Sequence, residues 1–306
     1  MSWKHVLSFG FFLTVLVLLL FYWILPVGNI VNFGYSTVGE NSNFSLINGT
    51  GMQFYDNMRY ADEEISYHIE DCPIPKVDEI TRAFEVIQNL TMLSFYEESL
   101  GKEEISITCD SATRVEGRTF IAGEGGVTNV TSSGQFSVIQ NGMVLLLRES
   151  KCPDPPVGIH EVLHSLGFDH SQNPNNVMYS TVKCGQTIGD DLVNNINRLY
   201  SVPSLPDIVI ENASASMQGS YLDVSVTLRN QGLIDSANAK LILYANEKQI
   251  EEFDVLPMSV GGGRAITLTN IFVLKGSIDT LELLINYGPE EINKNNNRLV
   301  LKINKK

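Results

Sequence analysis

The stretch HEVLHSLGFDH (160–170) contains three of the chain's 5 histidines, together with one glutamate and one glycine. On a helix, His160 and His164 are four residues apart and lie on one face, so both imidazoles can reach one metal ion. Gly167 permits a sharp departure from helical geometry, after which His170 can supply a third nitrogen. Three imidazoles leave the fourth position of a zinc ion open for water, which is typical of a catalytic site.

Glu161 follows the first of these histidines and points beside the metal without having to bind it. A zinc ion lowers the pKa of its water toward about 7, while a carboxylate beside it accepts the proton and later passes it to the leaving amine. Histidines that merely share a helix face are the alternative interpretation. The combination of His, Glu and Gly at this spacing favours a metalloprotease site, with Glu161 as general base.

Residues His160 to His170 resemble the HExxHxxGxxH motif of the metzincins, and Ser171 after the third histidine is similar to the matrixin branch, the matrix metalloproteinases. The stretch NVMY (176–179) resembles the Met-containing turn of that family. This resemblance implies that Met178 forms an apolar floor under the zinc ligands. It covers about residues 58–200.

The metzincin resemblance implies an α+β catalytic domain, with a mixed twisted sheet plus helices, and one catalytic zinc. It also implies a protein or peptide substrate lying extended along an edge strand between Gly123 and Gln140. The Gly-rich loop AGEGGVT (122–128) is compatible with a calcium ion as well.

Strand and helix patterns alternate through this region. The predicted strands are 64–71, 105–110, 136–140 and 143–149, and the predicted helices are 77–90, 155–166 and 190–200. The helix at 155 is expected to begin at Asp154 with two prolines and to stop at Gly167.

Four cysteines, Cys72, Cys109, Cys152 and Cys184, are spaced too widely for a Cys-x-x-Cys zinc site, so disulfides are the expected use. Three pairings of four cysteines exist, and free buried thiols are the alternative. Cys152 precedes the active-site helix and Cys184 follows the Met-bearing turn, so a bridge between them would clamp the two walls of the site. Cys72 with Cys109 would then tie two early strands.

An uncharged apolar run at 6–27 is long enough as a helix to cross the hydrocarbon core of a membrane. No small-residue cleavage site follows, which favours a retained signal-anchor (1–27) over a secreted enzyme. Lys4 lies before the run and the next basic residue is Arg59. The positive-inside tendency therefore predicts a single-pass protein of the cell membrane, with a cytoplasmic N-terminus and an extracellular catalytic domain.

The rest of the chain divides into a linker (28–55) rich in Asn, Gly and Ser, a catalytic domain (56–201) and a C-terminal domain (206–306). Two prolines in SVPSLPD (201–207) mark the last boundary. The C-terminal domain carries seven alternating apolar and polar runs, which predict an all-β antiparallel sandwich.

This C-terminal domain resembles the CARDB family, immunoglobulin-like adhesion-related modules of prokaryotic surface proteins. The segments that carry the resemblance are PDIVIEN (206–212), VTLRNQG (226–232) and NKNNNRLVL (293–301). The family implies a spacer or docking role toward a surface partner, and a purely structural sandwich is the alternative.

With 35 acidic and 21 basic residues, the chain has a net charge of -14, which disfavours nucleic acid as a partner. The sequence as a whole predicts a zinc-dependent endopeptidase that hydrolyses extracellular proteins. The competing hypothesis is a non-catalytic surface adhesin or scaffold that acts through the β-sandwich. An intact Glu161 argues against it, because binding alone needs no base beside the metal.

Overall fold

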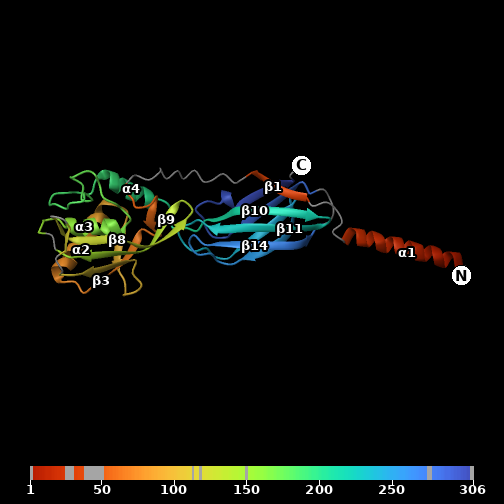
Figure 1. The fold of residues 1–306 in the computed structure, drawn as a ribbon, viewed down its shortest axis with the longest axis horizontal. Coiled ribbons are helices and arrows are strands. Elements are labelled where there is room, and N and C mark those ends of the chain that lie inside the picture. The colour runs from red at the N-terminus through yellow and green to blue at the C-terminus, as the bar shows by residue number, and fades with distance from the viewer. Residues whose placement is uncertain are drawn as a thin grey trace. The chain divides into compact units, whose positions relative to one another are not determined.

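The structure is a computed structural model that describes residues 3–24, 31–37, 52–111, 114–116, 119–148, 151–273 and 278–303. The chain separates into two compact units, shown in Figure 1. We call them the α/β unit (43–206 with 231–235) and the β unit (1–42, 207–230 and 236–306). Each unit has its own cluster of buried apolar side chains.

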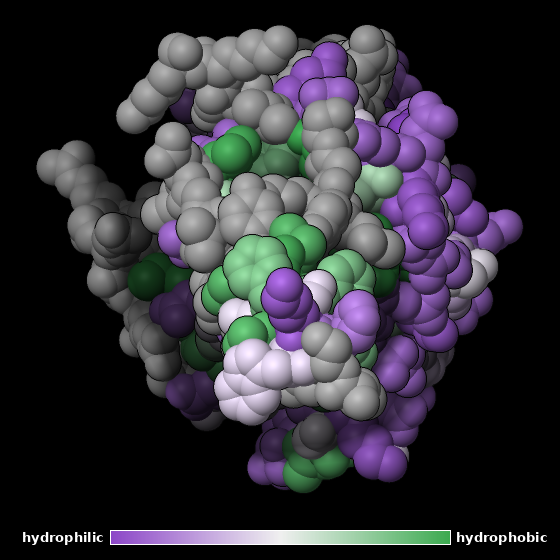
Figure 2. Space-filling view, turned by 90° about the vertical axis from the view of Figure 1, so that its right-hand side faces the viewer, coloured by the Kyte–Doolittle hydropathy of each residue, from purple (hydrophilic) through white to green (hydrophobic). Residues whose placement is uncertain are grey.

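The first element is helix α1 (Trp3–Ile24), which is rich in Leu, Phe and Val. Its 22 residues span about 33 Å at 1.5 Å per residue, close to the roughly 30 Å of a bilayer's hydrocarbon core. Figure 2 looks toward the N-terminal end of α1 and shows hydrophobic side chains gathered there. By length and composition α1 can cross a membrane, as a signal anchor or a transmembrane helix.

A mixed sheet forms the centre of the α/β unit. Its parallel strands have the order β2-β9-β5-β3-β4, and β8 pairs antiparallel with β9. The strands of this unit, including the small hairpin β6–β7, are β2 (Met58–Tyr60), β3 (Glu64–Glu70), β4 (Ser94–Glu97), β5 (Ile105–Cys109), β6 (Arg114–Glu116), β7 (Thr119–Ile121), β8 (Gly123–Ser133) and β9 (Phe136–Leu146).

Three helices complete the α/β unit: α2 (Ile74–Leu90), α3 (Pro156–Ser165) and α4 (Asp190–Tyr200). In α2 and α4 the buried residues recur at the three- and four-residue spacing of one helix face, whereas α3 is buried on all sides. On α2 the buried face includes Ile80, Phe84 and Ile87. The three helices predicted from the sequence are therefore present.

Strand β9 corrects one expectation. Residues 136–140 and 143–149 were predicted as separate strands, yet one strand runs from Phe136 to Leu146. Gly142 is required in its middle for a steric reason: a Cβ there would lie 2.5 Å from Oη of Tyr60. A glycine inside a strand marks here the close approach of a neighbour, not a turn.

The β unit is an antiparallel sheet with the order β13-β12-β15-β16-β1-β10-β11-β14 around the second apolar core. All seven strands predicted for the C-terminal domain form. They are β10 (Ile208–Gln218), β11 (Tyr221–Asn230), β12 (Ala239–Ala245), β13 (Lys248–Val255), β14 (Gly263–Phe272), β15 (Thr280–Asn286) and β16 (Arg298–Ile303), with a short 3-10 helix η1 (Asn295–Asn297) before the last.

The eighth strand, β1 (Val31–Thr37), lies within the segment 28–55 that was predicted as a linker. Residues 28–30 and 38–51 of that segment lie outside the described residues, and its end at 52–55 belongs to the α/β unit. The linker prediction is therefore wrong for 31–37. In β1 the alternation of apolar and polar residues covers only seven residues, within a segment rich in Asn and Gly. The strands that pair with β1 are far away in the sequence.

Candidate metal centre

Helix α3 carries the first two histidines of the cluster. It begins after Pro155 with Pro156 in its first turn, where a missing N–H costs nothing, and all ten of its residues are buried. His160 and His164 are one turn apart, and their ring centroids are 4.6 Å apart. The helix ends at Ser165, and the chain then turns back at Gly167.

The turn after α3 depends on glycine. Gly167 has a φ of +93°, and a Cβ there would lie 2.6 Å from Cγ and Sδ of the buried Met58. After this turn His170 returns toward the helix, with its ring centroid 4.8 Å from that of His164. The three imidazoles thus come together as the motif predicted, with ligand nitrogens all within 4.8 Å of one another.

Two backbone carbonyls fix the tautomers of the helical histidines. Nδ1 of His160 lies 2.7 Å from the carbonyl oxygen of Val177, and Nδ1 of His164 lies 2.7 Å from that of Phe168. A carbonyl oxygen can only accept, so each Nδ1 carries the proton and each Nε2 is left with a lone pair. Neither carbonyl could be predicted from the sequence, because any residue type can supply one.

The two Nε2 atoms lie 3.0 Å apart. Two lone pairs at this distance repel each other unless a cation lies between them or one ring takes up a second proton. Burial lowers the pKa of His160, and burial with the nearby His160 lowers the pKa of His164 to about 4, so a second proton is disfavoured. The donor set therefore fits a metal cation, with His170 as a third, exposed nitrogen.

Glu161 belongs to α3 and packs against strand β8. Its side chain is buried, and burial raises its pKa to about 8, against the opposing effect of a hydrogen bond from the backbone N–H of Gly125. Cβ atoms at Gly123 and Gly125 would lie 2.7 Å from Cγ and 2.2 Å from the backbone oxygen of Glu161, respectively. Glycine is required at both positions for β8 to approach the helix this closely.

The segment 122–128, considered for a calcium ion, instead packs against the helix: β8 begins at Gly123, and Gly123 and Gly125 face Glu161. Among the described residues, the only group of three or more metal-binding side chains is the histidine cluster. Calcium at the glycine-rich segment therefore finds no support.

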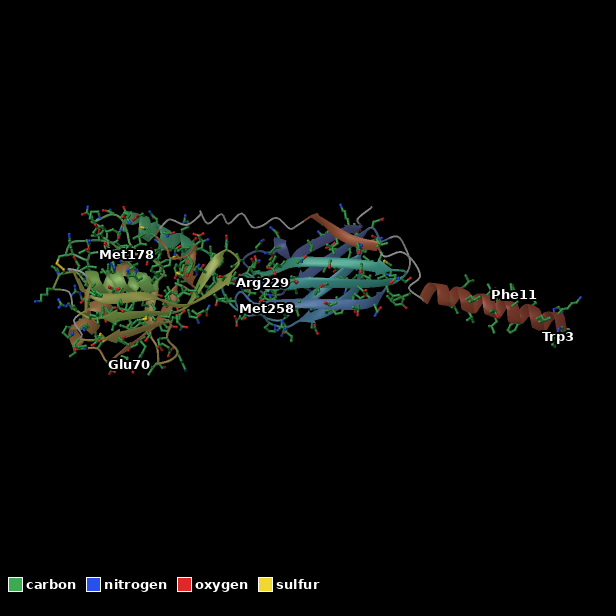
Figure 3. All side chains as sticks on the ribbon, viewed as in Figure 1. Trp3, Phe11, Glu70, Met178, Arg229 and Met258 are labelled. Carbon is green, nitrogen blue, oxygen red and sulfur yellow. A yellow bond between two sulfur atoms is a disulfide. The ribbon has the colours of Figure 1, made fainter. Side chains whose placement is uncertain are left out.

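The segment around Met178 supports the cluster from another side. Met178 is buried and belongs to the core of the α/β unit, where Figure 3 labels it. Its backbone N–H donates to Oδ1 of Asn176, its carbonyl accepts from Ser171 N–H, and its neighbour Val177 provides the carbonyl that orients His160. The turn thus connects the residue after the third histidine to the first histidine.

Residues 52–54 pair with the metal-binding turn. Phe54 N–H donates to Gly167 O at 3.1 Å, and Asp169 N–H donates to Met52 O at 2.8 Å. The ring of Phe54 stacks on His164 with centroids 5.9 Å apart. These residues, assigned to a linker on sequence, therefore brace the backbone between the second and third histidines.

Both disulfides formed as expected. Cys72 and Cys109 join the ends of the neighbouring strands β3 and β5, with Cα atoms 5.0 Å apart. Cys152 and Cys184 join the segment before α3 to the loop after Met178, with Cα atoms 5.3 Å apart.

The same loop is held by a residue that the sequence analysis did not single out. Gln186 is buried, its Nε2 donates to the carbonyls of Pro174 and Thr181, and its Oε1 accepts from the N–H of Lys183. One amide thus fixes three points of a loop that contains Val177 and therefore helps to set the orientation of His160.

Two family models match the chain. Residues 59–201 match the matrixin family, peptidase M10, which indicates a metallopeptidase, a zinc cofactor and a protein substrate. Residues 205–300 match the CARDB family. Both resemblances predicted from the sequence are therefore confirmed, each for its own segment of the chain.

Among solved structures, the chain is similar to the CARDB domain of a Pyrococcus furiosus protein in complex with di-metal ions. The sequence identity is 16%, the match covers 32% of this chain and 88% of that domain, and the TM-score is 0.26. No curated protein matches the chain.

Proposed function

We propose that the protein is a zinc-dependent endopeptidase of the metzincin type, with His160, His164 and His170 as zinc ligands and Glu161 as general base. The single observation that carries the proposal is the pair of Nε2 atoms 3.0 Å apart beside a third imidazole. Three histidines leave one position for a water or substrate oxygen, as in catalytic zinc sites. The matrixin match supports the same chemistry.

A bound zinc ion would supply Lewis acidity, which makes a water molecule acidic near neutral pH. Glu161 is suited to receive that proton, because its carboxylate is sheltered from solvent and held by the N–H of Gly125. A nearby dication would lower the pKa of Glu161 from about 8, so that the carboxylate is ionised at neutral pH. The protonated carboxyl then donates to the leaving amine.

Strand β8 offers a place for the substrate. It pairs with β9 on one side, and the order of the sheet leaves its other edge without a strand partner among the described residues. An extended peptide can add to such an edge through backbone hydrogen bonds. Because the start of β8 packs against Glu161, a peptide bound there would have its backbone beside the proposed general base.

Chain organisation follows from the same proposal. We assign residues 1–27 to a membrane anchor with a cytoplasmic N-terminus, 56–201 to the extracellular peptidase and 206–306 to a β-sandwich that serves as spacer or docking module. The two disulfides support an oxidising, extracellular environment. A surface scaffold without catalysis is the competing function, favoured by the CARDB match alone.

The test is hydrolysis of a quenched fluorescent peptide library by the detergent-solubilised full chain, with and without a zinc chelator. Glu161→Gln is expected to reduce turnover by about 10²- to 10⁴-fold, the usual contribution of a general base, while one zinc stays bound. Glu85→Gln removes an exposed carboxylate from α2 and serves as the matched control with unchanged turnover. A wild-type chain that binds zinc but cleaves nothing in the library would support the scaffold instead.

A further inference from the structure

Strand β1 lies between two strands of the β unit that come from the other end of the chain. Its first residues pair with β10, with Val31 opposite Met217 and Phe33 opposite Ala215. Its later residues pair with β16, with Tyr35 opposite Leu301. Phe33 takes part in both ladders, so β1 crosses from one neighbour to the other within seven residues.

Without β1, both neighbours would have an open edge. In the described part of the chain β10 pairs with β11 and β16 pairs with β15, and β1 is the strand that lies on the remaining side of each. An open edge exposes a row of backbone N–H and C=O groups that readily take another strand. We call this place between β10 and β16 the seam.

The side chains of β1 match the seam. Phe33 is 5% exposed and is part of the same buried cluster as Ala215 and Leu301, while Val31 packs against that cluster. Asn32, between them, is exposed. This alternation of apolar inward and polar outward residues is what a strand with one buried face requires.

All elements of the α/β unit, from β2 to α4, lie between β1 and β10 in the sequence. The strand therefore reaches the seam from a part of the chain that is separated in sequence from all its partners. Six residues, 25–30, are all that separates it from α1.

We infer that the seam between β10 and β16 is a strand-binding site whose occupant is residues 31–37 of the same chain, so that α1 is attached to the β unit by noncovalent strand pairing. A cut anywhere between β1 and the α/β unit then leaves α1 bound to the rest of the protein. Strand binding at the seam is independent of the peptidase chemistry.

The test uses the full chain with a recognition sequence for a specific protease inserted between Asn43 and Asn48. After complete cleavage in detergent, the N-terminal fragment is expected to co-elute with the remainder in size-exclusion chromatography and to separate in denaturant. Phe33→Asp introduces a charge into the core and is expected to abolish co-elution. Asn32→Asp introduces the same charge one residue away at an exposed position and should leave co-elution intact.

Hydrogen exchange shows whether Phe33→Asp acts at the seam or unfolds the unit. We expect faster exchange at the β1-facing amides of 215–217 and 300–303, with protection retained in β12 and β15. The inference would be overturned if the N-terminal fragment of the wild-type sequence separated from the remainder after cleavage under native conditions. It would also be overturned by a dimer in which the strand comes from a second copy, since the occupant would then not be the same chain.

Discussion

Replacing Gly167 by Ala tests whether the turn between the second and third histidines requires glycine for two separate reasons. A positive φ alone disfavours an L-residue by about 1–2 kcal/mol. The added Cβ also meets Met58 at 2.6 Å, and Met58 is 1% exposed and cannot easily move away. Overpacking of this kind costs about 1–3 kcal/mol, so the total destabilisation should be roughly 2–5 kcal/mol.

Gly101→Ala is the matched control, because Gly101 has a similar φ of +83° with nothing within 4 Å of an added Cβ. Its destabilisation should contain the backbone contribution alone, about 1–2 kcal/mol. The assay is urea unfolding of both variants, followed by zinc affinity in a chelator competition. Gly167→Ala should also bind zinc more weakly, since the turn positions His170. Equal destabilisation by the two substitutions would refute the packing argument.

Two further predictions concern other buried polar groups. Gln186→Leu keeps the volume but leaves backbone groups such as the carbonyl of Pro174 without partners, so urea unfolding should show a loss of about 2–4 kcal/mol. Gln186→Glu keeps the acceptor for Lys183 but places a buried carboxylate oxygen against two carbonyl oxygens, so its loss should be at least as large. Burial raises the pKa of Asp207, despite its hydrogen bond from Asn296, so the folded state holds this proton more tightly than the unfolded state. The contribution of Asp207 to the free energy of unfolding should therefore rise as pH falls toward the ordinary carboxyl pKa near 4. Asp207→Asn should weaken this rise. A urea midpoint with the same pH dependence in both proteins would contradict the prediction.

The local parts of the site could be predicted from the sequence. Helical spacing alone places His160 and His164 on one face, and Gly167 marks the end of the helix at the observed turn. The pairing of Cys152 with Cys184, one of three pairings open to four cysteines, was preferred from where the two lie relative to that helix, and it is the one observed. The helix face and its end depend on residue types a few positions apart, which a single sequence displays directly.

The parts that could not be predicted depend on contacts between distant segments. The carbonyls of Val177 and Phe168 orient two imidazoles, but a carbonyl leaves no trace in residue type. Gly142 looks like a break in a strand until Tyr60 is placed beside it. Strand β1 shows its period over seven residues only, and its partners lie at the other end of the chain.

The central claim is that three imidazoles bind one zinc ion and leave a position for the reaction. X-ray absorption at the zinc edge of the full chain tests it most directly. We expect one zinc per chain with three nitrogen neighbours at about 2.0–2.1 Å and one oxygen neighbour at a similar distance. Sulfur neighbours, or a zinc content unchanged in His160→Ala combined with His164→Ala, would contradict the account.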